Sequence, residues 1–239
     1  MSNTYFSFKQ FKINQDRCAM KVCTDACLFG AWTADKLKDT SIKKVLDIGC
    51  GTGLLSLMLA QKIPATIDAI EIDQAAADQA AENISASPWA NNIAVINSSM
   101  QDYIPAEKYD LIICNPPFYE NDLRSDDANK NAAKHDTTLR LETLTSFIKT
   151  YLNEAGLVAL LLPFHRTDYL EQITNGQGLF TKEKLLVRQS PKHDHFRSIL
   201  LLTKKDNGPA TTNELIIHDE ARNYTAAFQE YLKDYYLKM

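Results

Sequence analysis

The feature that most limits what this chain can fold into is a glycine-rich turn early in the sequence. A short β-prone run, Val45–Ile48, leads into the turn, and a stretch of helical composition, Leu54–Lys62, follows it. Within the turn, Gly49, Gly51 and Gly53 fall at every second position. Glycines let a ligand approach the backbone, and the start of the helix offers unpaired N–H groups. The order of strand, turn and helix predicts the beginning of a nucleotide-binding βαβ unit, and therefore an α/β fold.

An acidic residue in front of the glycines indicates which ligand this turn binds. Dinucleotide-binding turns follow the pattern G-x-G-x-x-G, whereas here Asp47 precedes glycines at alternate positions. A carboxylate at the end of the strand repels a pyrophosphate but helps to hold an ammonium group. The favoured cofactor is therefore S-adenosylmethionine, which has no phosphate and carries the ammonium group of an amino acid.

Two further acids follow predicted strands. Glu71 ends the run that begins at Thr66, 24 residues after Asp47. An acid at the end of the second strand can accept hydrogen bonds from both ribose hydroxyls. Asp102 comes shortly after a third predicted strand at Ile93–Ile96. Its carboxylate is placed to accept a hydrogen bond from the adenine amino group of the cofactor; a solvated turn residue is the alternative.

The fourth predicted strand, Lys108–Cys114, ends in a segment suited to binding an amino-bearing ring, Asn115-Pro116-Pro117-Phe118. The Asn115 side-chain oxygen and the Pro116 carbonyl can accept both hydrogens of an exocyclic amine. Two successive prolines stiffen the turn, and Phe118 can stack on a base. The motif indicates methyl transfer to an exocyclic amine without a metal or a covalent intermediate; a structural turn is the alternative.

Short links between these elements predict a parallel sheet with its ligand site at the carboxyl ends of the strands, where the three acids and Asn115 fall. Strands near Lys184–Arg188 and Ser198–Thr203 are expected to form an antiparallel hairpin at the sheet edge. Thr24 or Asp25 is expected to cap an earlier helix. The chain of 239 residues shows no internal repeat. We expect one domain composed of an N-terminal leader and helix in 1–40, a catalytic core in 41–205, and a C-terminal strand and helix in 206–239.

A basic segment stands out in a chain whose formal net charge is −4. The acidic balance argues against general affinity for nucleic acid. Between Lys182 and Arg197, however, five side chains are basic and two are acidic. Arg188, Lys192 and Arg197 are therefore candidate contacts to RNA phosphates, with a plain solvated hairpin as the alternative. Lys130 and Lys134 are further candidates; they lie in a long polar segment that is either a functional lid or a solvated loop.

The cysteines predict neither a metal site nor disulfides. Their number, five, is odd, no C-x-x-C pair occurs, and the spacing of Cys18, Cys23 and Cys27 fits no zinc site. Free thiols in a reducing compartment are expected. No apolar run approaches the roughly 20 residues of a membrane span, and the first residues do not resemble a secretory signal. We therefore expect a cytoplasmic protein without a metal and without membrane contact.

The motifs at Asp47–Gly53 and Asn115–Phe118 resemble those of class I adenosylmethionine-dependent methyltransferases that act on planar nitrogens. That class implies a Rossmann-like, seven-stranded, mostly parallel sheet with an antiparallel edge hairpin. Nearly the whole chain is similar to the bacterial valine-tRNA adenine-37 N6-methyltransferase family. The segments that carry this wider resemblance are Phe8–Phe11, Met20–Asp25, Asn115–Asp136, Val187–Pro191 and Tyr224–Leu237.

The resemblance implies a substrate and further cofactor residues. The partner would be the anticodon loop of a valine tRNA, and the products N6-methyladenosine and S-adenosylhomocysteine. Lys21, Thr24 and Asp25 would line the methionine end of the cofactor. One departure is that Cys23 and Ala26 stand where the family usually has glycine.

Related activities share the Asn-Pro-Pro-aromatic motif. They include methylation of glutamine side chains in release factors, and of guanine or adenine in DNA or ribosomal RNA. A protein that binds the cofactor but does not catalyse is a further alternative, against which the intact Asn115 and Phe118 argue.

Overall fold

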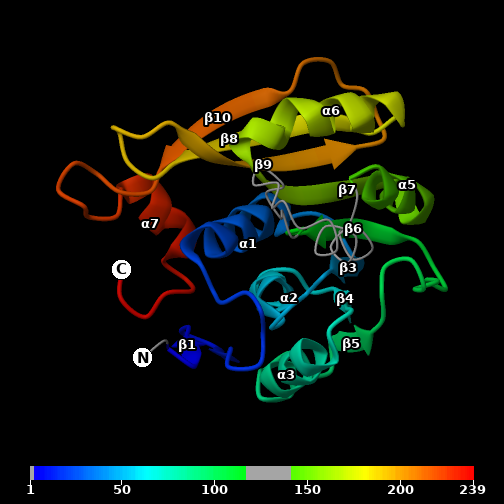
Figure 1. The fold of residues 1–239 in the computed structure, drawn as a ribbon, viewed down its shortest axis with the longest axis horizontal. Coiled ribbons are helices and arrows are strands. Elements are labelled where there is room, and N and C mark those ends of the chain that lie inside the picture. Colours follow the sequence, from blue (N-terminus) through cyan, green and yellow to red (C-terminus); the bar gives the residue numbers. More distant parts are fainter. Residues whose placement is uncertain (1–2, 117–140) are drawn as a thin grey trace, which may run out of the picture.

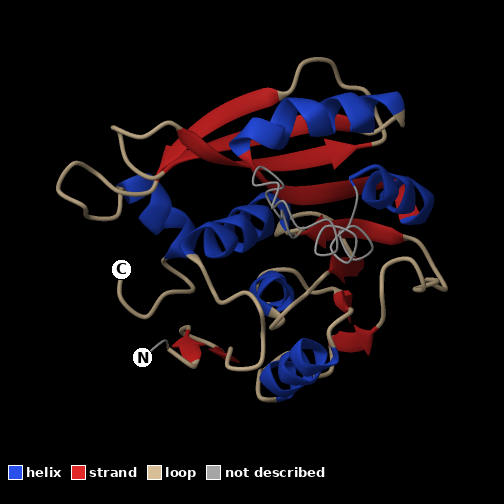
Figure 2. Cartoon of the chain, viewed as in Figure 1, coloured by secondary structure: helices blue, strands red, loops and turns tan. Residues whose placement is uncertain are grey.

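The computed structural model of the chain describes residues 3–116 and 141–239, and within them the central feature is one eight-stranded sheet (Figure 1). Its strands lie in the order β10-β8-β9-β7-β6-β3-β4-β5. Their bounds are β3 Lys44–Ile48, β4 Thr66–Glu71, β5 Ile93–Asn97, β6 Tyr109–Cys114, β7 Leu152–Pro163, β8 Phe180–Arg188, β9 His195–Thr203 and β10 Thr211–Ile216. Helices connect the strands (Figure 2), with bounds α1 Thr24–Leu37, α2 Leu54–Ala60, α3 Gln74–Ser85, α5 Leu141–Tyr151, α6 Thr167–Gly176 and α7 Ala226–Leu232.

The strands are parallel except for β9, which runs antiparallel to both β7 and β8. The predicted α/β class, the mostly parallel sheet and the antiparallel hairpin near its edge are therefore confirmed. The sheet has one strand more than the seven expected, because β10 pairs with β8 outside the hairpin. Leu215 of β10 is buried in the core, and burial of this side chain stabilises the pairing of the extra strand with the sheet.

Side chains that alternate along the strands enter two separate hydrophobic cores. Val45 and Leu111 pack with α1, α2, α3 and α7 in one core. Leu46 and Ile112 pack with α5 and α6 in the other. A parallel sheet covered on both faces needs apolar residues at successive positions, which explains why its strands have continuous apolar runs. In the described part of the chain, no helix has the length and apolar character needed to cross a membrane.

The leader folds back onto the C-terminal end of the chain. β1, Tyr5–Ser7, and β2, Lys12–Asn14, form an antiparallel hairpin. Phe8 makes an isolated bridge with Tyr236, and their ring centroids lie 6.0 Å apart. Figure 1 accordingly shows both ends of the chain on the same side of the molecule.

The helix expected within 206–239 is short, and aromatic side chains in it and after it pack against the rest of the molecule. α7 ends at Leu232, and the following residues form a turn and an irregular segment. Phe228 and Tyr235 are nevertheless buried, and the Tyr235 hydroxyl donates to the Met58 carbonyl oxygen at 3.0 Å. This aromatic face therefore holds the end of the chain against α2.

The start of α1 differs from the prediction in its cap. Cys23 occupies the N-cap position with an extended backbone, and no side chain caps the helix. Thr24 and Asp25 lie in the first turn instead. The Asp25 carboxylate turns toward Arg197 of β9, so it does not bond the free N–H groups of its own helix.

Candidate active site

The carboxyl ends of β3, β4, β5 and β6 lie side by side at one edge of the sheet. Ile48 is opposite both Ile70 and Cys114, and Glu71 is opposite Asn97. After β3 the chain adds β4 and β5 on one side of that strand, and it then adds β6 and β7 on the other side. Ligands of open α/β sheets bind beyond the strand ends at such a change of direction. The predicted site residues that follow these strands therefore share one edge.

Asp47 is fully buried at this edge, and only one of its carboxylate oxygens is paired. Ser56 Oγ donates to Asp47 Oδ2 at 2.7 Å, whereas Oδ1 has no partner among the described residues. Burial raises the pKa of Asp47 to about 7; the Ser56 hydrogen bond opposes this rise, and the Glu71 carboxylate adds to it. An unpaired buried oxygen is costly unless a ligand bonds to it, and a cationic ligand would favour the ionised form.

The glycine turn leaves room in front of β3. Gly51 has a φ of 54°, and a Cβ added there would meet no atom within 4 Å. Gly53 has a φ of 82°, but a Cβ there would lie 3.3 Å from the Ile84 side chain of α3. Gly53 therefore permits close packing of two helices, while Gly51 faces open space that a ligand can occupy.

Glu71 is oriented by the glycine turn. One of its oxygens accepts from the Gly51 N–H at 2.9 Å, and the other accepts from the Asp73 N–H at 2.9 Å. A carboxylate offers about four acceptor positions, so both oxygens can accept further hydrogen bonds. The Glu71 carboxylate is thus held beside the glycine turn and can still accept hydrogen bonds from a ligand.

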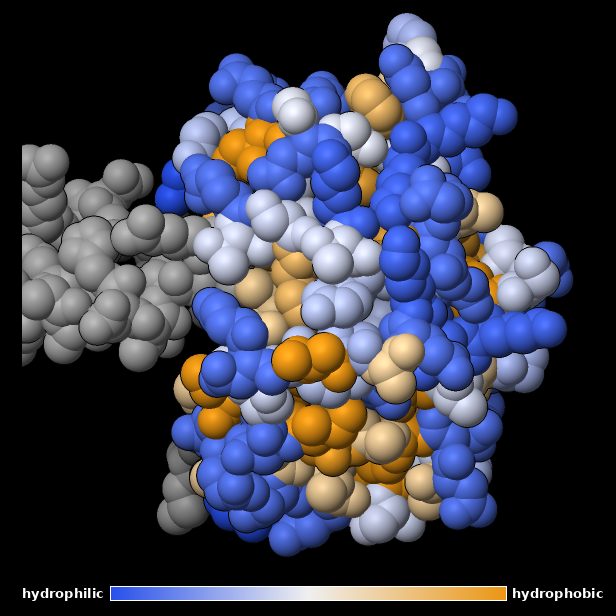
Figure 3. Space-filling model, turned by 90° about the vertical axis from the view of Figure 1, so that its right-hand side faces the viewer, coloured by the Kyte–Doolittle hydropathy of each residue, from blue (hydrophilic) through white to orange (hydrophobic). Residues whose placement is uncertain are grey.

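Sequence reasoning missed Ile72, which directly follows Glu71. Its side chain is 68% exposed, an unusual exposure for isoleucine at the end of a buried strand. Ile104, which follows β5, is 81% exposed. Figure 3 shows one face of the molecule, on which apolar side chains gather in the lower half. The signal that could have identified Ile72 is a large apolar residue immediately after a strand-end acid.

Asp102 lies in the loop after β5 and is exposed. Its Oδ2 accepts from Ser99 Oγ at 2.6 Å, and its own N–H donates to the same hydroxyl at 3.1 Å. These two bonds hold the carboxylate in a local turn and leave its second oxygen open to a ligand.

Asn115 follows the last residue of β6, and its side-chain amide has no hydrogen-bond partner in the described part of the chain. Asn115 is half-buried and Pro116 is buried. A half-buried amide that bonds to none of the described residues is available to a ligand. Pro117 and Phe118 lie outside the described residues, as do Lys130 and Lys134.

The residues expected at the methionine end of the cofactor occupy the entry to α1. Lys21 Nζ donates to the Asn3 carbonyl at 3.2 Å, and Thr24 opens the helix. Asp25 Oδ2 accepts from Arg197 Nε at 2.7 Å. A predicted cofactor residue and a predicted RNA residue therefore contact each other.

Much of the positive charge on the β8–β9 hairpin is already paired. Arg188 Nε lies 3.2 Å from a Glu214 oxygen on β10, and Lys184 Nζ lies 2.8 Å from Glu171 on α6. Lys192, in the turn between the strands, is exposed and makes no ion pair with a described residue. The net charge of the sequence segment therefore overstates the charge that an RNA would meet.

Among the described residues, no group of three or more His, Cys, Asp or Glu side chains could hold a metal ion. All five cysteines are free thiols, as predicted.

Comparison with known proteins shows which proteins share this fold. The methyltransferase small domain family matches residues 31–139. Among solved structures, a predicted O-methyltransferase from Agrobacterium tumefaciens has a TM-score of 0.67 and 18% identity, covering 88% of this chain and 96% of that one. A ribosomal protein L11 methylase from Lactobacillus delbrueckii subsp. bulgaricus has a TM-score of 0.58 and 18% identity, covering 80% of this chain and 84% of the other. These likenesses show that the chain has the Rossmann-like fold of class I methyltransferases.

Curated relatives identify the family to which the chain belongs. A protein of Parabacteroides distasonis is 39% identical over 241 residues, covering 100% of both chains, and one of Cytophaga hutchinsonii is 39% identical over 246 residues with the same coverage. A third, from Pectobacterium carotovorum, is 39% identical over 238 residues, covering 98% of this chain and 94% of its own. All three are named tRNA1(Val) (adenine(37)-N6)-methyltransferase. The chain belongs to this family, which confirms the resemblance seen in its leader and its C-terminal ending.

Proposed function

We propose that this enzyme transfers a methyl group from S-adenosylmethionine to the N6 amine of adenine 37 in a valine tRNA. S-adenosylhomocysteine is the second product. The observation that carries the proposal is the Asn115 amide at the end of β6, which no described residue pairs, next to the strand ends that carry Asp47 and Glu71. The choice of adenine in tRNA rests on the names of relatives that match the whole chain.

The residues at the sheet edge fit this cofactor. Asp47 Oδ1, which has no partner among the described residues, can accept a hydrogen bond or interact electrostatically with the cofactor ammonium. Gly51 has no Cβ, so the space in front of it stays open for the cofactor. Glu71 retains acceptor capacity for the two ribose hydroxyls. The exposed Ile72 can pack on the adenine ring, and the open oxygen of Asp102 can accept from its amino group. Gly49 and Gly53 shape the same turn, and we assign Lys21, Thr24 and Asp25 to the methionine end.

When bound, the cofactor supplies an electrophilic methyl group on a positively charged sulfur. Asn115 Oδ1 and the Pro116 carbonyl oxygen accept the two N6 hydrogens of the adenine and so orient its nitrogen lone pair. This orientation opposes delocalisation of the lone pair into the ring, and positioning of this kind lowers the barrier to a bimolecular step. The nitrogen would form its bond to the methyl carbon as the bond between that carbon and sulfur breaks; the electron pair would stay on sulfur, giving S-adenosylhomocysteine, and one N6 proton would pass to solvent.

The remaining assignments concern the base and the RNA backbone. Phe118 stacks on the target base and Pro117 stiffens the turn in this proposal, on sequence grounds. The base must leave its stack to reach Asn115, as in other enzymes that act on bases. Lys192 contacts an RNA phosphate from the hairpin turn, and Arg188 and Arg197 contribute through the donors that their ion pairs leave free. Lys130 and Lys134 extend this contact along the segment after Phe118.

Transfer of tritiated methyl groups to total tRNA, followed by nucleoside analysis, tests the proposal. The expected result is label in N6-methyladenosine. Label in protein would identify glutamine methylation instead, and label in another nucleoside would identify a different base. No transfer to any acceptor would support a protein that binds the cofactor without catalysis.

A further inference from the structure

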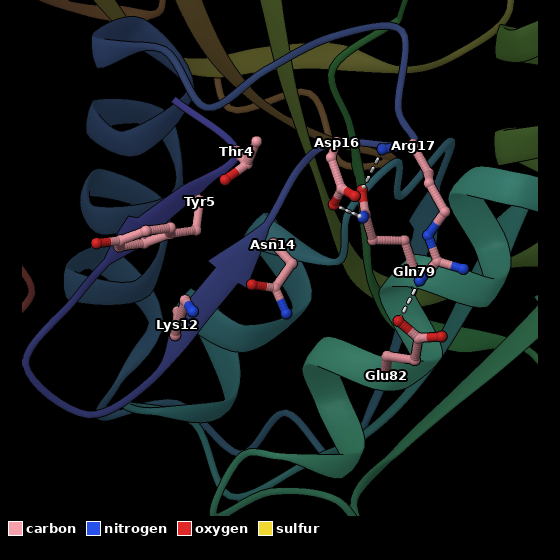
Figure 4. Close-up of a pocket in the computed structure, with 8 residues that line it drawn as sticks. All are labelled: Thr4, Tyr5, Lys12, Asn14, Asp16, Arg17, Gln79 and Glu82. Carbon is pink, nitrogen blue, oxygen red and sulfur yellow. Dashed lines mark hydrogen bonds and ion pairs between the residues drawn. The ribbon is translucent and has the colours of Figure 1, made fainter. Parts of the chain in front are cut away.

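A polar cavity of about 490 Å³ lies between the β1–β2 hairpin and α3 (Figure 4). Tyr5, Lys12 and Asn14 line it from the hairpin, and Gln79 and Glu82 line it from α3. Figure 4 shows these two groups of side chains on opposite sides of the cavity. None of them belongs to the candidate active site. Cavities of this size are typical of sites for small organic groups.

The wall on the α3 side is held in place by paired polar groups. Gln79 is completely buried; its side chain donates to Asp16 Oδ1 at 2.6 Å and accepts from the Arg17 N–H at 3.2 Å. Arg17 also forms an ion pair with Glu82. Because these groups bond to one another, the wall is prearranged; Arg17 offsets the charge of Glu82, whereas Asp16 keeps its charge and bonds to the neutral Gln79 amide.

The hairpin side, by contrast, presents side chains without hydrogen-bond or ion-pair partners among the described residues. The Asn14 side-chain amide has no hydrogen-bond partner among the described residues, although the Asn14 backbone is bonded to Asn83 in both directions. Tyr5 is 48% exposed. Lys12 Nζ lies 4.2 Å from the centroid of the Tyr5 ring and makes no ion pair with a described residue. The cavity therefore offers a ring, an amide and an ammonium group.

That combination matches the three chemical parts of a nucleotide. An amide can donate and accept along the edge of a base, an aromatic ring can stack on its face, and an ammonium group can bind its phosphate. Base stacking is stronger than an exposed cation–π contact, so a base can displace Lys12 from the Tyr5 ring toward a phosphate. We propose that this cavity binds one single-stranded nucleotide of the substrate RNA, distinct from the adenine that is methylated.

The place of the cavity in the fold agrees with this assignment. The N-cap of α3 is Asp73, whose N–H donates to Glu71 at the candidate active site. Gln79 follows Gln74, the first residue of the helix, by five positions, or about 7.5 Å along the axis. A single-stranded loop that presents one base to Asn115 can therefore present another part here. Proteins commonly recognise RNA loops by stacking and by bonds to base edges. The inference rests on the proposed function, because it takes RNA as the substrate.

Variants of Tyr5 and Asn14 test the site. Asn14→Ala removes the free amide but keeps the backbone bonds to Asn83, so the hairpin should stay in place. Tyr169→Ala is the matched control, because Tyr169 is also exposed, at 44%, with the Arg166 guanidinium 5.9 Å from its ring. We expect Tyr5→Ala and Asn14→Ala each to raise the KM for tRNA about tenfold, as for loss of one stacked or bonded base. Affinity for S-adenosylhomocysteine should stay within about twofold, and Tyr169→Ala should match the wild type.

Several outcomes would overturn the assignment. If the wild type methylates tRNA and both cavity variants keep its KM within about twofold, the cavity does not bind the substrate. The same conclusion follows if Tyr169→Ala raises the KM as much as Tyr5→Ala. If the wild type transfers no methyl group to tRNA, the proposed function itself fails, which is a different result.

Two further measurements distinguish RNA from a free nucleotide as the ligand. Transcripts that carry 4-thiouridine in the anticodon loop should crosslink to the peptide that contains Tyr5; crosslinks confined to other peptides would contradict the proposal. Uridine 5′-monophosphate, which does not resemble the adenosine of the cofactor, is the probe for free nucleotides. Competition of this nucleotide with tRNA in the wild type, reduced in Tyr5→Ala, would support the site. Saturable binding of it without any effect on tRNA would overturn the RNA assignment.

Discussion

Arg197 Nε lies 2.7 Å from Asp25 Oδ2, and this ion pair joins the start of β9 to the first turn of α1. The two residues are 172 positions apart in the sequence. Their side chains are 35% and 14% exposed, so the pair is partly shielded from solvent. It connects the proposed methionine end of the cofactor site to the hairpin proposed to contact RNA.

A double-mutant cycle measures this connection. Asp25→Asn and Arg197→Ala should each lower the free energy of unfolding, because each leaves a partly buried group without its charged partner. The double variant should lose less than the sum, with an interaction energy of about 1 kcal/mol in urea unfolding. The exposed pair Lys233–Glu230 is the control, for which about 0.3 kcal/mol is expected. An interaction energy no larger than in the control would show that the pair contributes little.

The buried Asp47 predicts a pH dependence of stability. Its pKa is about 7 in the folded protein, against about 3.9 in an unfolded chain. The folded state therefore holds the proton more tightly, and this site lowers the stability progressively as the pH rises from about 4 to about 7. Asp47→Asn removes the titration but keeps an oxygen that can accept from Ser56. Between about pH 5 and about pH 8, urea unfolding should show the variant gaining more than about 1 kcal/mol relative to the wild type. Parallel pH profiles in the two proteins would contradict this explanation.

Glu71→Ala should weaken binding of S-adenosylhomocysteine at least tenfold in calorimetry, because charge-assisted hydrogen bonds contribute about 1.5–3 kcal/mol each. Part of the loss comes from the glycine turn, since Glu71 also accepts from the Gly51 N–H. Asp78→Ala on the exposed side of α3 is the control and should bind normally. Unchanged affinity in Glu71→Ala would refute the assignment.

Asn115→Ala should separate catalysis from cofactor binding. We expect turnover to fall about a hundredfold or more, as for loss of a prearranged polar group at a reacting centre, with cofactor affinity within a few-fold of the wild type. Asn207→Ala, in an exposed loop, should retain full turnover. Near-wild-type turnover in Asn115→Ala would show that the amide does not orient the amine.

The local amino-acid sequence was sufficient to predict much of the fold. The strands predicted at Val45–Ile48, Thr66–Glu71 and Lys108–Cys114 lie within one residue of those in the structure. These elements have strong periodicity and clear breaks, so that neighbouring residues determine them. Parallel pairing then places Asp47, Glu71 and Asn115 at one edge, because Asp47 and Glu71 lie in the last residues of β3 and β4, Asn115 directly follows β6, and β3 pairs with both β4 and β6.

Long-range contacts were not predictable in this way. Nothing near Leu215 in the sequence indicates that β10 pairs with β8, and nothing near Asp25 indicates Arg197 as its partner. Such contacts depend on how the folded helices and strands pack against one another. For the same reason, the charge count of the hairpin misjudged its surface: the acids that neutralise Arg188 and Lys184 come from β10 and α6.

The central claim is methylation of N6 on adenine 37 of a valine tRNA, and one measurement tests it most directly. Two unmodified transcripts of this tRNA, one with adenine and one with guanine at position 37, are incubated with the enzyme and labelled S-adenosylmethionine. The products are digested and their nucleosides identified. We predict N6-methyladenosine from the adenine transcript and no label from the guanine transcript. Equal labelling of both transcripts, or label in any other nucleoside, would contradict the claim.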